Sequence, residues 1–248
     1  MNATERSRLL ECRHCRHRTG VGFIDLPESD LDFMSSFKQG HESASANSIL
    51  IRQGQRRAKV FTLYSGLAVR FRLLPGARRQ VLRILLPGDL VGLQTLYSSP
   101  SFAAVQSITD VTMCRFDPRR WEELLRRPGL AARICEIQAI DRRKTEARLC
   151  AVGAAGARAN LCHFVADLYF GLRRRRLASR LDFELPVGIQ QLADALGVTP
   201  THLRRTAAAL DREGVLAVRR RQIVIHDLDR LADIAATTDD WSSDRPLV

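Results

Sequence analysis

The middle of the chain alternates hydrophobic and polar residues with a period of two. Between residues 68 and 73 the larger apolar side chains fall on every second position, at Val69, Phe71 and Leu73. This alternation is typical of a strand with one buried face. Glycines recur at intervals of 12, 10 and 12 residues, at Gly54, Gly66, Gly76 and Gly88. Turn signals at this spacing predict short antiparallel strands in a barrel or roll over residues 28–117.

The pattern becomes helical after Asp117-Pro118. Residues 119–127 predict a short helix closed by Pro128-Gly129, and residues 130–152 predict a long one. The long helix carries a narrow apolar stripe, made of Leu130, Ile134, Ile137 and Ile140. A long helix with a narrow stripe has little core to cover within one chain, so we expect dimerisation through this stripe. Packing against the chain's own β-roll is the alternative.

Residues 188–206 have the pattern of a helix-turn-helix. Ala193 is small enough for a close helix crossing, and Gly197 can end the first helix with a positive φ. Thr199 can cap the second helix, and Pro200 suits its first position. A helix over Asn160–Leu172 precedes the motif, and a short hairpin over Leu216–Ile225 follows it. The alternative is an ordinary helical pair with a solvated charged face.

The second helix of such a motif enters the major groove of DNA with its N-terminal residues against the bases. Arginine can read guanine with two hydrogen bonds, whereas arginines on a hairpin suit backbone phosphates. The expected DNA contacts are Thr199, Thr201, His202, Arg204 and Arg205, with Arg219, Arg220 and Arg221 on the hairpin.

Composition narrows the class of protein. The 248 residues are 45% hydrophobic, enough for a sizeable core, and no apolar run is long enough for a membrane span. The N-terminus lacks the apolar run of a secretion signal, so we expect a cytoplasmic protein. The net charge of +12 favours an anionic partner. We find no nucleophile–base pair, HExxH or Gly-rich phosphate loop, so we do not expect an enzyme.

The order of β-roll, long helix, helix-turn-helix and hairpin wing resembles the Crp/Fnr family of transcription regulators. The similarity is close in Leu86-Pro-Gly-Asp-Leu-Val-Gly-Leu93, Ser101-Phe-Ala, Val111-Thr-Met-Cys114 and the helix-turn-helix. It implies an α+β fold with a cyclic-nucleotide-binding-like β-roll, a dimerisation helix and a C-terminal winged helix-turn-helix. It also implies a homodimer that binds a palindromic operator on double-stranded DNA and contacts RNA polymerase.

The expected organisation has five parts. These are an N-terminal arm with a Cys pair (1–27), a β-roll sensor (28–117), the short and dimerisation helices (118–152), the DNA-binding domain (153–235) and a mobile tail (236–248). Within the DNA-binding domain, best-known members carry Glu where this chain has Thr201, so we expect a different operator. Arg205 matches the family's recognition arginine.

The resemblance suggests two kinds of signal. Cyclic-AMP-binding members hold the phosphate with an Arg-Ser pair, because a buried phosphate needs a positive partner or several donors. The equivalent stretch here, residues 97–106, contains no basic residue, so cyclic-nucleotide binding is disfavoured.

The Fnr branch instead holds a [4Fe–4S] cluster, with three cysteines near the N-terminus and one at the end of the β-roll. Cys12, Cys15 and Cys114 match this set. The Fnr spacing places the third N-terminal cysteine at Val21, which cannot ligate. Histidine replaces cysteine at some cluster sites. The remaining ligand is therefore sought among His14, His17 and a nearby carboxylate such as Asp25, with a water or a small thiol as the alternative.

Four other interpretations of these cysteines remain open. They are a structural zinc site, a thiol switch, unligated thiols, and a metal-free regulator that senses a small molecule in the β-roll. A disulfide framework is not expected in a reducing cytoplasm. Cys135, Cys150 and Cys162 lie in helical segments without a ligand pattern, and we expect them to be small core residues.

Overall fold

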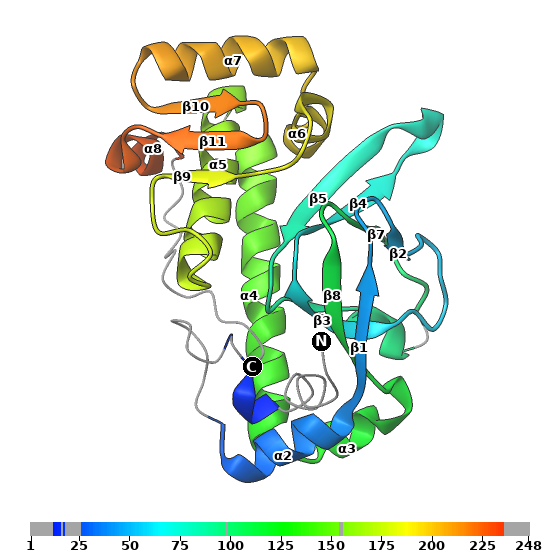
Figure 1. Cartoon of the computed structure of the whole chain (residues 1–248). Coiled ribbons are helices and arrows are strands. Elements are labelled where there is room, and N and C mark those ends of the chain that lie inside the picture. Colours follow the sequence, from blue (N-terminus) through cyan, green and yellow to red (C-terminus); the bar gives the residue numbers. More distant parts are fainter. Residues whose placement is uncertain (1–11, 16, 18–25, 98, 154–155, 236–248) are drawn as a thin grey trace. The chain divides into compact units, whose positions relative to one another are not determined.

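The computed structural model describes residues 12–15, 17, 26–97, 99–153 and 156–235, drawn in colour in Figure 1. These residues form two compact units. The first contains the described residues before Leu73 together with 84–139, and the second contains Leu73–Arg83 with the described residues from Ile140 onward. None of the described helices is long and apolar enough to span a membrane. The five-part division expected from the sequence stays a prediction, and its tail (236–248) lies outside the described residues.

Two antiparallel sheets form the predicted β-roll. One has the strand order β1-β8-β3-β6, with bounds Lys38–Ala44, Val111–Phe116, Val60–Ser65 and Leu90–Val91. The other has the order β2-β7-β4-β5, with bounds Ile49–Ile51, Ala104–Ser107, Ala68–Leu73 and Arg79–Leu85. The predicted alternation holds for Val69 and Phe71, which are buried, but Leu73 is 50% exposed at the end of its strand.

The predicted turn glycines have left-handed backbone conformations. Gly66, between β3 and β4, has φ +82°, and a Cβ there would collide with the carbonyl oxygen of Asp110. Only glycine adopts this positive φ readily and also lacks the Cβ that would collide. Short 3-10 turns lie in the connections, at Pro75–Ala77 (η3) and Leu93–Tyr97 (η4).

A helix precedes the first strand, where a β-rich segment was predicted. Residues Glu28–Phe37 form α2, which buries Leu31, Met34 and Phe37 on one face. Their spacing of three residues is helical, and Pro27 stands directly before the helix. The period-2 interpretation was therefore wrong for these ten residues.

The predicted dimerisation stripe lies in the core of its own chain. After the turn η5 (Pro118–Arg120) and the short α3 (Trp121–Leu125), α4 runs over Pro128–Gly153, so Pro128 opens the long helix. Leu130, Ile134 and Ile137 are buried against Met34 and neighbouring apolar side chains, and Ile140 is half-buried. The three buried residues share one buried cluster with residues of α2 and of the β-roll strands β3 and β8, as the alternative expects, and pairing of the stripe with a second copy stays a prediction. A different face of α4 is exposed, and it includes Ala132, Cys135, Ala139 and Leu149.

The second unit is a helical domain with a small sheet. Its elements are α5 (Gly156–Arg174), β9 (Asp182–Glu184), α6 (Ile189–Leu196), α7 (Pro200–Arg212), β10 (Leu216–Arg219), β11 (Gln222–Ile225) and α8 (Leu228–Ala235). The predicted hairpin is β10–β11, and β9 adds a third antiparallel strand that the sequence did not indicate. Figure 1 shows α7 alongside this sheet. Cys162 is fully buried in α5 as expected, but Cys135 and Cys150 are exposed, so their core assignment was wrong.

Candidate functional site

The helix-turn-helix has the predicted local geometry. Gly197 ends α6 in the left-handed region at φ 67°, and its N–H donates to the carbonyl of Ala193. Thr199 caps α7 by accepting a hydrogen bond from the backbone N–H of His202 at 3.2 Å, and Pro200 is the first helical residue. The shared core of the two helices comprises Leu192, Ala193, Leu196, Leu203 and Leu210. Each signal in the sequence therefore has the structural role assigned to it.

The expected DNA-contacting side chains line the outer surface of the motif. On α7, Thr201, Arg204 and Arg205 are exposed and His202 is half-buried. The first turn of α7 contains no acidic residue, so its N-terminal dipole and the arginines both favour an anionic partner. The wing places Arg219, Arg220 and Arg221 in solvent around a tight turn, in which Arg221 has φ 64°.

A buried polar network holds the C-terminal end of α6, the first helix of the motif. The side-chain amide of Asn160, on α5, donates to the carbonyl oxygen of Leu196 at 2.9 Å. Arg148, on α4, donates to the Asn160 amide oxygen at 2.8 Å and also to the Ala195 carbonyl. Burial lowers the pKa of Arg148 to about 10. Neither Asn160 nor Arg148 was predicted from the sequence. The available signal was Asn160 itself, a single asparagine within the apolar run of a helix.

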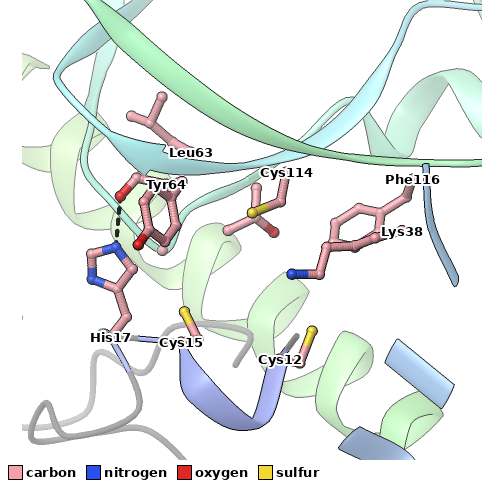
Figure 2. A pocket seen from close by; sticks show the side chains of 10 residues that line it. Cys12, Cys15, His17, Lys38, Leu63, Tyr64, Cys114 and Phe116 are labelled. Carbon is pink, nitrogen blue, oxygen red and sulfur yellow. Dashed lines mark hydrogen bonds between the residues drawn. The ribbon is translucent and has the colours of Figure 1, made fainter. Parts of the chain in front are cut away.

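A second site lies in the first unit, where two distant cysteine segments meet. Cys12 opens the short 3-10 turn η1 (Cys12–His14) and is 3% exposed. Its backbone N–H donates to Ser35 Oγ of α2 at 2.8 Å, which fixes the turn against the core. Cys114 lies in β8, between β1 and β3. Figure 2 shows the sulfurs of Cys12 and Cys15 directed toward the strand that carries Cys114.

The three thiols line one small cavity, which we call the thiol pocket. Its lining comprises Cys12, Cys15, His17, Lys38, Thr62, Leu63, Tyr64, Gly88, Cys114 and Phe116. The open volume is about 20 Å³, which is room for one water molecule. A larger group would require η1 to move outward from the strands. Four of the lining residues, Cys12, Cys15, His17 and Cys114, are candidate metal ligands from the sequence, and their ligation stays a prediction. The sequence gave no indication of Lys38 or Thr62.

Burial favours the protonated form of two thiols in the pocket, Cys12 and Cys114. It raises the pKa of Cys114 to about 12 and raises the pKa of Cys12 as well, while the ammonium of Lys38 opposes both shifts. Figure 2 shows the Lys38 amine reaching between Cys12 and Cys114. Thiolates would form here when a bound cation compensates their charge, because metal binding releases the thiol protons.

The three candidates for a further ligand differ in position. His14 is exposed, and Asp25, like Val21, lies outside the described residues. His17 is 8% exposed at the wall of the pocket, and its Nε2 donates to the Tyr64 carbonyl at 2.6 Å (Figure 2). Metal-bound histidines commonly hold a backbone carbonyl with the second ring nitrogen. Across the described part of the chain, no three His, Cys, Asp or Glu side chains are arranged to hold a metal ion.

Residues 97–106 correspond to the phosphate-binding segment of cyclic-AMP-binding proteins, and in this fold a basic side chain from another strand reaches them. Residues 97–106 contain no basic side chain, but Arg72 reaches the segment from β4. Its guanidinium lies 3.9 Å from the centre of the Phe102 ring and donates to the Phe102 carbonyl at 2.6 Å. The hydroxyl of Ser101 is buried and donates to the carbonyl of Ala103. Sequence reasoning missed Arg72 because it comes from another strand.

Two family models match two separate segments of the chain. The cyclic nucleotide-binding domain matches residues 41–128, and the Crp-like helix-turn-helix domain matches residues 160–234. The transcriptional activator protein FnrL of Cereibacter sphaeroides is 28% identical over 242 residues, which are 94% of each chain. An anaerobic regulatory protein of Haemophilus influenzae is 22% identical and covers 92% of this chain and 89% of its own.

The fold also occurs in solved structures. FixK2 from Bradyrhizobium japonicum is 24% identical, with a TM-score of 0.65 over 80% of this chain and 98% of that one. A β-roll of the cyclic-nucleotide-binding type followed by a Crp-like helix-turn-helix defines a DNA-binding transcription regulator, not an enzyme. The chain belongs to the Crp/Fnr family.

Proposed function

We propose that this regulator acts as a homodimer on a palindromic operator, and that an iron–sulfur cluster held by Cys12, Cys15 and Cys114 controls its binding to DNA. The observation that carries the proposal is the meeting of these three cysteines in one buried pocket, although about 100 positions of sequence separate Cys114 from the other two. One relative is an anaerobic regulatory protein, and this supports oxygen or redox state as the signal that the cluster would detect. Such a regulator would act in the cytoplasm and contact RNA polymerase.

The residues of the thiol pocket fit a [4Fe–4S] group chemically. They offer three soft sulfur ligands, a cationic Lys38 that would balance negative charge, and a Thr62 hydroxyl that makes no hydrogen bond to any described residue. When bound, the cluster would supply a redox-active centre whose integrity depends on its ligands. Cys12, Cys15 and Cys114 would hold it.

A cluster and a single zinc ion require different spacings of the three sulfurs. Tetrahedral zinc would bring its sulfur ligands to about 3.8 Å from one another, given Zn–S bonds of about 2.3 Å. No three ligand side chains among the described residues have a single-ion arrangement. In a four-iron cluster each cysteine binds a different iron, so the sulfurs lie farther apart.

We propose His17 as the fourth ligand. Of the three candidates, it is the one that is both described and buried at the pocket wall. The hydrogen bond to Tyr64 would orient its ring. To ligate the cluster, the His17 ring would have to shift together with η1. A cluster larger than the 20 Å³ cavity requires the same outward movement of η1.

The pocket is coupled to the long helix within the first unit. Cys12 belongs to the same buried cluster as Met34 of α2 and as Leu130 and Ile134 of α4. Any outward movement of η1 therefore disturbs the packing of the N-terminal part of α4. We propose that the exposed face of this helix, with Cys135 and Ala139, pairs with a second copy, so that ligand binding at Cys12 and Cys114 alters the dimer.

The experiment is purification of the full chain without oxygen, followed by iron, sulfide and zinc analysis, absorption spectroscopy and operator binding before and after exposure to air. We expect about four irons and four sulfides per chain, as in a [4Fe–4S] centre, and oxygen-dependent DNA binding. Cys114→Ser should abolish the cluster, whereas Cys135→Ser, at an exposed cysteine, should not. A colourless, iron-free protein with equal DNA binding in both conditions would refute the proposal, and stoichiometric zinc would favour a structural metal.

A further inference from the structure

Thr62 stands directly beside Cys114 in the sheet. The two residues are paired in the antiparallel register of β3 and β8, and His41 is the partner of Cys114 on the other side, in β1. Directly opposed residues project from the same face with Cβ atoms about 4.5–5.5 Å apart. Both Thr62 and Cys114 line the thiol pocket, so this face of the sheet is the one that meets η1.

The hydroxyl of Thr62 has no hydrogen-bond partner among the described residues. Thr62 is 8% exposed, and its Oγ1 is inaccessible to solvent. A buried donor left unpaired destabilises the fold, and valine would fill the same volume without that penalty. The side chains around it are largely apolar or sulfur-bearing, with Leu63, Phe116 and Cys114 among them. A water molecule or a bound group in the pocket would satisfy this hydroxyl.

The acceptor that suits this position is negatively charged sulfur. A neutral thiol accepts a hydrogen bond weakly, whereas a thiolate or sulfide accepts strongly. The hydroxyl thus gains a strong acceptor when Cys114 becomes a thiolate ligand or when a cluster sulfide occupies the pocket.

We infer that Thr62 is a positioning residue of the cluster, whose hydroxyl donates a hydrogen bond to negatively charged sulfur in the thiol pocket and raises the cluster's reduction potential. The inference rests on the proposed function. A hydrogen bond to sulfur stabilises the reduced, more negative state of a cluster more than the oxidised one, and such bonds are a principal control of cluster potential. Thr62 does not ligate iron and is not expected to be needed for cluster assembly.

The test compares the iron-loaded full chain with two variants, Thr62→Val and Thr62→Ser, under exclusion of oxygen. Valine keeps the shape and removes the hydroxyl, and serine keeps the hydroxyl. Potentiometric titration of the cluster absorption should show a lower potential for Thr62→Val and a value near that of the natural protein for Thr62→Ser. A proton coupling to the reduced cluster that magnetic resonance shows in water and that disappears in deuterium oxide should be present in the natural protein and Thr62→Ser and absent from Thr62→Val.

The outcomes separate this inference from the proposed function. Equal potentials and equal proton coupling in the natural protein and Thr62→Val overturn the inference and leave the cluster intact. A natural protein without iron and sulfide overturns the proposed function, and this inference with it. If Thr62→Val fails to load iron, Thr62→Ala provides the second hydroxyl-free variant. Normal loading and an unchanged potential in Thr62→Ala then assign Thr62 to packing and overturn the inference.

Discussion

The side-chain amide of Asn160 donates a 2.9 Å hydrogen bond to the carbonyl oxygen of Leu196, the last residue of α6. The final carbonyls of a helix have no partner within the helix and must be satisfied from outside. Asn160 is 3% exposed and is itself held by Arg148, so a buried polar network anchors the end of the first helix of the DNA-binding motif.

Replacing Asn160 with leucine should therefore destabilise the second unit. The substitution leaves the Leu196 carbonyl and one Arg148 N–H without these partners in a buried site, which costs about 1–3 kcal/mol. Urea unfolding should show this loss together with weaker operator binding. The control is Gln190→Ala on α6, because the Gln190–Asp194 hydrogen bond is exposed and its loss should change stability little. Equal stability of Asn160→Leu and the natural protein would contradict the role of the network.

The two groups of exposed arginines should have different effects on DNA binding. We expect Arg205→Ala to cost about 1–3 kcal/mol at the preferred operator and to relax specificity at one base pair, because an arginine near the start of α7 can read guanine. Arg219→Ala in the wing should weaken binding to all sequences alike and reduce the salt dependence by about one unit of slope. Affinities for operator and random DNA, measured at several salt concentrations, distinguish the two. A uniform loss for Arg205→Ala would assign it to phosphate instead.

The accuracy of these expectations differs along the chain for physical reasons. Gly197, Thr199 and Pro200 were assigned correctly because a helix end, a cap and a first turn depend on neighbouring residues alone. The stripe at Leu130 and Ile134 was located correctly as an apolar face, but periodicity does not say what covers that face. Here α2 covers part of it, and this helix was missed because its apolar residues are few and lie next to the β-rich region.

The thiol pocket could be predicted only in part. Cys12 and Cys15 form a local pair, but their proximity to Cys114 depends on long-range folding, and only the family resemblance linked them. Thr62 and Lys38 were not predicted, since their place beside Cys114 depends on which residues pair across strands. Strand register is a property of the assembled sheet and is not encoded in any single segment.

Alkaline pH should destabilise the second unit through Cys162. This thiol is fully buried in α5, and burial raises its pKa from 9.0 to about 11 in the folded protein. A raised folded-state pKa gives stability that is complete below pH 9 and is lost as the pH rises toward 11, because the unfolded chain ionises first. The loss can reach about 3 kcal/mol, at 1.36 kcal/mol per pKa unit. Unfolding measured from pH 8 to 11 should be steeper for the natural protein than for Cys162→Ala, with the exposed Cys135→Ala as the matched control.

Cys135 should report the proposed dimer directly. It lies on the exposed face of α4 with Ala132 and Ala139, at the spacing of a helix–helix seam. If two copies of α4 pair in parallel through this face, the two Cys135 thiols approach each other across the twofold axis. Mild oxidation or a short bis-maleimide should then give a covalent dimer, and Cys135→Ser should not. Ala139→Glu should favour monomers in analytical ultracentrifugation. Efficient dimerisation of Ala139→Glu would place the interface elsewhere.

Thr62→Val should stabilise the cluster-free protein more than the cluster-loaded protein. Without the cluster, the substitution removes a buried hydroxyl that has no partner among the described residues, so the free energy of unfolding should rise by about 1–3 kcal/mol. With the cluster, the same change removes a hydrogen bond to sulfur and should lower that gain or reverse its sign. Thermal or urea unfolding of both forms, without oxygen, measures the two effects. The control is Thr112→Val in the neighbouring strand, whose hydroxyl is exposed near Ser43 and should be insensitive to cluster loading. Equal effects of Thr62→Val in both forms would show that the hydroxyl does not distinguish an empty pocket from a filled one.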